Sequence, residues 1–236
     1  MEKHIIYQRI AGSLEDIAKL NNLLYAMSST DIQRYADNYE VLAIEAALRA
    51  EKIACRQRHL IFQGTRVQKR DYLESAADAL DISVASDEGV VYISIPGLMP
   101  KRKQNASTEF LLDPLYYAMG HFMDSQKRLP RYEECVVHFT QVYDRSLPSR
   151  RIRDFDNLEL KQVLDIITAF VMVDDGGLLC EVHHCSQLGD TDKTLISVME
   201  KRTFPWWLLA QKQGKRMSDL CLEFEGVNPT SHEDDN

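Results

Sequence analysis

The feature that most constrains the fold is a change of hydrophobic period near Ile82. Before it, apolar side chains recur at helical spacing, as in the segments 13–27 and 30–58. After it, β-branched residues alternate with polar ones in 82–84 and 90–95, on either side of the turn sequence Ser86-Asp87-Glu88-Gly89, which predicts a β-hairpin. This order of patterns predicts an α+β fold, in which helices precede a mixed sheet.

We expect three parts in the chain. Residues 1–81 form an N-terminal helical region, with Ser13 as a candidate N-cap and a third, short helix at 71–80. Residues 82–226 form a domain with a mixed sheet and flanking helices, and 227–236 form a disordered acidic tail. Inside the second part, helices are expected at 110–125, after Asp156 and around 206–209, and strands at 135–143, 178–185 and 194–199.

Charge and cysteine content limit the functions that fit. A formal net charge of -8 argues against indiscriminate coating of nucleic acid, because that binding depends on cations that neutralise phosphates. Five scattered cysteines in a chain without an export signal favour free thiols in a reducing compartment. No apolar run approaches the ~18 residues typical of a membrane span. We therefore expect a cytoplasmic protein that does not contact a membrane.

Carboxylates flank one amphipathic helix in the second half of the chain. Asp154 and Asp156 lie two residues apart, so an extended segment projects both from one face, with Cα atoms roughly 6.5 Å apart. Asp174 and Asp175 follow the helix. If a turn or strand brings the chain back, these carboxylates can share one divalent cation. The alternatives are a helix N-cap at the first pair and an ordinary turn at the second.

Two groups of cations accompany the acids. They are candidate contacts for DNA phosphates, and the alternative is a solvated surface. The first group is Lys101, Arg102 and Lys103, and the second is Arg150, Arg151 and Arg153.

Taken in order, these segments resemble a known family. ISIPGLMPKRKQ at 93–104, RDFDNLELKQVLD at 153–165 and DD at 174–175 are similar to the motifs of the RusA-like Holliday-junction resolvases. Those motifs are a Pro-Gly, Pro-Lys segment and an Asp-x-Asp-Asn, Lys, Asp, Asp-Asp signature. The likeness covers roughly residues 90–200. It implies a RusA-like mixed sheet and a magnesium-dependent endonuclease that acts as a homodimer on branched DNA in recombination and repair.

The resemblance also implies a role for each motif residue. Asp156 and Lys161 take part in catalysis, and Asn157 fixes the loop. Lys161 lies four residues after Asn157, whereas the family usually has three. On a helix the two spacings differ by ~100° in direction. The implied ligands of Mg²⁺ are Asp154, Asp156, Asp174 and Asp175.

Two classes of function stay open. One is a Mg²⁺-dependent endonuclease that cuts branched DNA such as Holliday junctions. The other is a catalytically decayed DNA-binding or protein-interaction factor, which the displaced lysine, the added helices and the acidic balance suggest. The whole layout is also similar to uncharacterised proteins of bacterial mobile elements.

Two further groups of residues have more than one interpretation. Cys180, His183, His184 and Cys185 fall in an expected strand, where their spacings do not converge on one tetrahedral zinc site. Trp206 and Trp207 are candidates for stacking on bases, but packing in a core or in a dimer interface is the favoured interpretation.

Overall fold

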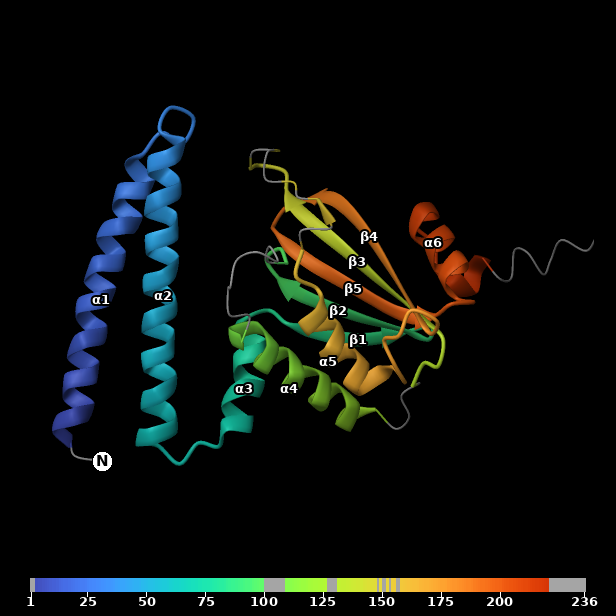
Figure 1. Ribbon diagram of the computed structural model, residues 1–236, viewed down its shortest axis with the longest axis horizontal. Coiled ribbons are helices and arrows are strands. Elements are labelled where there is room, and N and C mark those ends of the chain that lie inside the picture. Colours follow the sequence, from blue (N-terminus) through green and yellow to red (C-terminus); the bar gives the residue numbers. More distant parts are fainter. Residues whose placement is uncertain are drawn as a thin grey trace, which may run out of the picture. The chain divides into compact units, whose positions relative to one another are not determined.

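The computed structural model describes residues 3–99, 109–126, 131–147, 149, 152, 154–155 and 158–220. The chain divides into two compact units, Met1–Tyr72 and Leu73–Asn236, and each is described by itself. The predicted fold class is confirmed, because a helical N-terminal region precedes a five-stranded mixed sheet with flanking helices (Figure 1). Within the described residues, every helix is too short or too polar to cross a bilayer.

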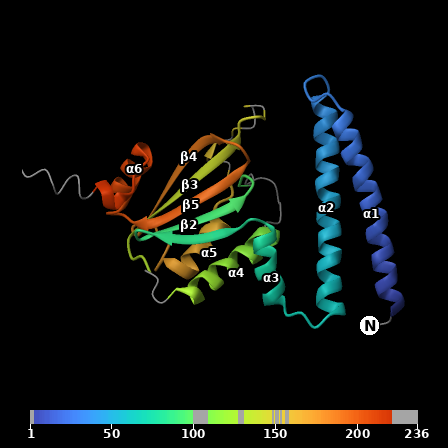
Figure 2. The same ribbon diagram turned by 180° about the vertical axis from the view of Figure 1, so that it is seen from behind.

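The first unit is a hairpin of two long helices. Helices α1 (Lys3–Ser29) and α2 (Ala36–Gly64) pack side by side (Figures 1 and 2). Ser13 does not begin α1 but lies inside it, where its hydroxyl donates to the Arg9 carbonyl oxygen at 3.1 Å. This back-bonding satisfies the hydroxyl within the helix, so the expected N-cap is wrong.

Charged and small residues join α1 to α2. Asp16 is only 4% exposed, and its carboxylate accepts hydrogen bonds from Arg49, at 3.1 Å, and from Arg56. Lys52 pairs with the same carboxylate at 3.3 Å, and Arg56 also donates to the Gly12 carbonyl oxygen at 2.8 Å. Burial raises the pKa of Asp16, but the Lys52 hydrogen bond and the three positive charges outweigh it and hold this pKa below its usual value. An ionic network therefore fixes the hairpin.

The second unit is built on one mixed sheet. Its strand order is β1-β2-β5-β3-β4, and only β3 and β4 pair in parallel. The predicted turn of the first hairpin is confirmed: Glu88 and Gly89 connect the strands with φ of 50° and 77°, as a tight two-residue hairpin turn requires. The strands are β1 (Ser83–Asp87), β2 (Val90–Pro96), β3 (Cys135–Asp144), β4 (Cys180–Gly189) and β5 (Lys193–Glu200).

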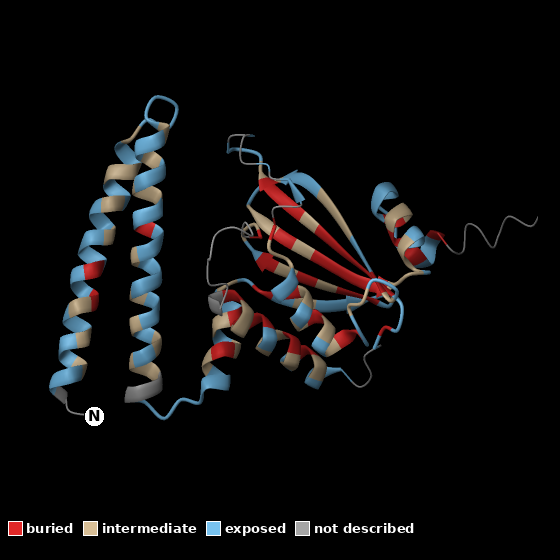
Figure 3. Cartoon of the chain, in the orientation of Figure 1, coloured by how far each residue is buried: buried red, intermediate tan, exposed pale blue. Residues whose placement is uncertain are grey.

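Helices cover both faces of this sheet. On one face, α4 (Glu109–Ser125) and α5 (Lys161–Val171) bury apolar side chains such as Leu115 and Ile167 in the main core. On the other, α6 (Phe204–Gln213) inserts Trp207 against Val136 and Met199. The central strands are accordingly buried over most of their length (Figure 3).

Helix α3 (Lys69–Ala79) leads into the second unit. Its residues Leu73 and Ala77 are buried, and Ala77 belongs to the main core together with Ile82. The division between the two units at Tyr72 and Leu73 therefore falls earlier in the chain than the expected boundary between 81 and 82.

Candidate functional site

Helix α5 presents the candidate catalytic lysine at its first residue. The Lys161 ammonium donates to the Asp165 carboxylate at 2.9 Å, one turn further along the same helix. The residue at the N-cap is Leu160, which makes no side-chain capping bond. The expected cap at Asp156 is therefore wrong, because α5 begins only after residues 158–160, which are not helical.

The chain returns to Lys161 after the helix ends. Met172 forms an isolated parallel bridge with Tyr132, immediately before β3. A short segment then brings the Asp175 carboxylate to 4.0 Å from the Lys161 ammonium. The Asp174 carboxylate accepts a hydrogen bond from the Asp175 backbone at 3.0 Å. Three charged side chains, of Lys161, Asp165 and Asp175, thus meet beside the start of α5.

A glycine lies beside the Asp174 carboxylate in the turn that follows it. A Cβ atom at Gly176 would lie 2.8 Å from the Asp174 carboxylate, closer than side chains normally approach. Glycine at this position therefore lets the Asp174 side chain fold back over its own turn.

The electrostatics of this cluster keep Lys161 charged. The hydrogen bond from Lys161 to Asp165 and the charge of that carboxylate raise the pKa of the lysine, and Asp175 and Glu159 add to the effect. The Lys161 side chain is 71% exposed, so a ligand can reach it. Such an ammonium can neutralise a non-bridging phosphate oxygen.

Most of the other predicted site residues lie outside the part of the chain that the structure describes. Asp154 is described and exposed, but Asp156 and Asn157 lie outside the described residues. Among the residues that the structure describes, no three Asp, Glu, His or Cys side chains converge closely enough to hold a metal ion. The magnesium site that includes Asp156 stays a prediction. The predicted cations also lie outside the described residues: Lys101, Arg102, Lys103, Arg150, Arg151 and Arg153.

An aromatic stack holds the segment that carries Asp154. The Phe155 ring stacks on His184 of the edge strand β4, with centroids 5.4 Å apart, and His184 stacks on Phe139 of β3 at 5.7 Å. Burial, followed by the charge of His183, lowers the pKa of His184. The sequence pattern places His184 in a strand next to possible zinc ligands and does not predict this stack. Phe155, the aromatic residue between Asp154 and Asp156, is the sequence feature that could have indicated this stack.

His183 and His184 lie on opposite faces of β4. The His183 ring contacts Phe204 of α6 at 4.6 Å, whereas His184 faces Phe139 on the α5 side. This alternation is the geometry expected of neighbouring residues in a strand.

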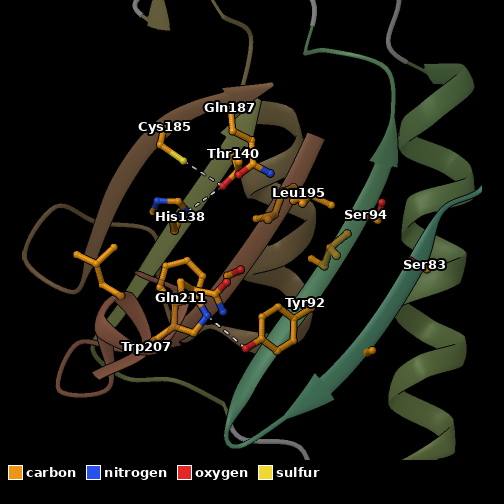
Figure 4. A pocket seen from close by; sticks show the side chains of 15 residues that line it. Ser83, Tyr92, Ser94, His138, Thr140, Cys185, Gln187, Leu195, Trp207 and Gln211 are labelled. Carbon is orange, nitrogen blue, oxygen red and sulfur yellow. Dashed lines mark hydrogen bonds between the residues drawn. The ribbon is translucent and has the colours of Figure 1, made fainter. Parts of the chain in front are cut away.

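A concave site lies between α6 and the sheet. It is a cavity of about 350 Å³ on the face opposite to α5 (Figure 4). Trp207 donates through its indole N–H to the Tyr92 hydroxyl at 3.2 Å. The Thr140 hydroxyl lies 3.3 Å from His138 Nδ1 and 3.2 Å from Cys185 Sγ. None of the 15 lining residues is Asp, Glu, Lys or Arg, so this cavity does not suit a phosphate.

Comparison with known protein families identifies a match that spans most of the chain. The sequence model of a family of unknown function, DUF6100, matches residues 2–221. No curated protein matches the chain.

Proposed function

We propose that this chain, which belongs to the DUF6100 family of unknown function, is a magnesium-dependent endonuclease that cuts branched DNA such as Holliday junctions. The observation that supports this most is the 4.0 Å separation of the Lys161 ammonium and the Asp175 carboxylate. These two residues belong to separate motifs, with all of α5 between them. Their approach agrees with the order of acids and lysine that the RusA-like resemblance requires.

The proposed donor set suits Mg²⁺, which prefers carboxylate oxygens and needs few protein ligands. The resemblance assigns the ion to Asp154, Asp156, Asp174 and Asp175; the three of these that the structure describes, Asp154, Asp174 and Asp175, do not by themselves converge as a metal site, so the proposal depends on Asp156. When bound, this ion neutralises phosphate oxygens and makes a water nucleophilic. Lys161 adds a fixed positive charge at the same end of α5, where it can stabilise the negative charge that develops on the phosphate.

Asp165 orients the lysine in this proposal. Its carboxylate accepts the 2.9 Å hydrogen bond from Lys161, which restrains a side chain that is otherwise long and exposed. Positioning of this kind matters because small displacements of a catalytic group are costly in rate.

Binding of DNA is assigned to the two groups of cations before the site. We propose that Lys101, Arg102 and Lys103 and the arginines that precede Asp154 contact phosphates on either side of the cut. The cytoplasmic location and the homodimer that the resemblance implies are part of the same proposal.

The decisive assay is cleavage of synthetic four-way junctions by the purified chain, with Mg²⁺ omitted and then restored. We expect Asp156→Asn and Asp175→Asn to abolish cutting and Lys161→Met to reduce it by about 10²- to 10³-fold. Asp190→Asn and Lys212→Met, which change exposed residues outside the motifs, are the matched controls. Equal activity in the wild type and all motif variants would end the proposal.

A second candidate is a DNA-binding or protein-interaction factor that has lost catalysis. It is favoured by the ion pair between Lys161 and Asp165, which can serve to stabilise α5 without any metal. Junction binding that is insensitive to Mg²⁺ and to Asp156→Asn, without cleavage, would support this candidate instead.

A further inference from the structure

The hairpin of α1 and α2 buries almost none of its large apolar side chains. Among the side chains that the structure describes in residues 3–72, the buried ones belong to Ser13, Asp16 and Ala46. Ten large apolar residues of the two helices are instead between 38% and 68% exposed. Helices in proteins are stabilised chiefly by packing of an apolar face. The hairpin therefore offers an apolar surface that another molecule can cover.

The clearest such surface is a stripe along α1. Its members are exposed and are separated by three and four residues in turn, which is the heptad spacing of a coiled-coil seam. The stripe consists of Tyr7, Ile10, Leu14, Ile17, Asn21 and Leu24, and we call it the α1 seam.

No charge lies on the α1 seam or beside it. Between residues 6 and 25, the heptad positions that flank the seam hold uncharged side chains. The charged residues of this stretch are Arg9, Glu15, Asp16 and Lys19, and all of them fall on the remaining heptad positions. A second copy of the same helix can therefore approach without repulsion between like charges. A membrane surface fits less well, because cations and anions on this helix balance instead of forming a basic face.

Asn21 points to the arrangement of the two copies. In a parallel, in-register pair, Asn21 faces Asn21 of the second copy, and the two amides can hydrogen-bond. A single asparagine at such a position is a known determinant of register and of oligomeric state. In an antiparallel pair Asn21 instead faces Ile10, which leaves its amide against an apolar side chain.

We propose that the α1 seam pairs in parallel with the α1 seam of a second copy, so that the chain is a homodimer held by its N-terminal hairpin. This interface lies outside the residues that resemble the RusA-like family and does not depend on nuclease activity. In a parallel pair, both chains continue into their second units from the same end of the paired hairpins. If the proposed function is correct, that symmetry suits a two-fold symmetric DNA junction.

The first test is the oligomeric state of the full chain, measured by sedimentation equilibrium over a range of concentrations. We expect a dimer whose dissociation constant rises at least about 30-fold in Leu14→Glu. The matched control is Leu48→Glu on α2, because Leu48 is 61% exposed and Leu14 is 62% exposed. A wild type that is monomeric at every concentration overturns the proposal, as does equal dissociation by both variants.

The second test fixes the orientation and does not require a disruptive charge. In a Cys55→Ser background, Leu24→Cys should form a disulfide-linked dimer on mild oxidation, because residue 24 faces its own copy in the parallel pair. An antiparallel pair would separate these two positions by roughly 25 Å, at 1.5 Å per helical residue. The control is the Cys55→Ser variant alone. A dimer that does not cross-link through Leu24→Cys contradicts the parallel seam. Neither test uses DNA or Mg²⁺, so failure here leaves the cleavage assay unaffected.

Discussion

Ile167 allows the packing of the helix that carries Lys161 to be tested quantitatively. Its side chain is 0% exposed and lies in the main core between α5 and the sheet. Ile167→Ala removes three buried carbon groups, which at ~0.8 kcal/mol each amounts to about 2.4 kcal/mol. The cavity left behind adds to this, because the surroundings relax only partly, and the total cost becomes about 3–5 kcal/mol.

The assay is thermal unfolding of the full chain followed by circular dichroism and by tryptophan fluorescence. Both tryptophans lie on α6, so fluorescence reports on the second unit alone. For a unit of this size, about 2–4 °C is lost per kcal/mol, so we expect the fluorescence midpoint to fall by about 6–20 °C. The control is Ile166→Ala, because this neighbouring isoleucine is only partly buried. Equal shifts in the two variants, or a shift below about 3 °C for Ile167→Ala, would refute the packing described for α5.

Two other perturbations probe a buried tryptophan and two histidines of the sheet. Trp207→Ala should destabilise the second unit by about 3–5 kcal/mol in urea unfolding, because a buried indole is lost. Trp206→Ala, at a more exposed position, should have a small effect. Similar losses of stability in the two variants would contradict the placement of α6. Burial, followed by the charges of His183 and His184, lowers the pKa of His138, and burial also lowers that of His184. The unfolded chain therefore takes up protons at a higher pH than the folded chain. We expect the free energy of unfolding to keep its full value above pH about 6.5 and to fall as the pH decreases below it. The fall should be smaller in His138→Gln. A urea midpoint that does not fall between pH about 7.5 and about 5.5 would contradict this sign.

Local patterns predicted most of the elements, but not where the two long helices begin. The Asp31 carboxylate accepts hydrogen bonds from the backbones of Gln33 and Arg34, at 2.9 and 3.2 Å, and so forms a turn that delays α2 until Ala36. The helical spacing over 30–58 predicts an earlier start for this helix. Polar side chains that hydrogen-bond to neighbouring backbone groups favour both turns and helix N-termini, so their presence does not show which of the two forms.

The arrangement of the strands was not predictable in the same way. The β1–β2 hairpin follows from its two-residue turn, whereas the insertion of β5 between β2 and β3 joins segments far apart in the chain. The parallel pairing of β3 with β4 depends on α5 crossing between them. Such pairings are set by tertiary packing, about which local periodicity carries no information.

The spacing of Lys161 shows how a local assumption can mislead. Lys161 lies four residues after Asn157, which on a continuous helix would rotate it by ~100° from the position usual in the family. Residues 158–160 are not helical, and Lys161 is the first residue of α5, so no such rotation applies. The direction of the lysine is set by α5 itself, through Asp165 one turn later, and by the return of the chain to Asp175. The extra residue therefore gives no reason to reject a catalytic role. The cleavage rate of Lys161→Met, compared with that of Asp165→Asn, is the measurement that separates catalysis by the lysine from stabilisation of its helix.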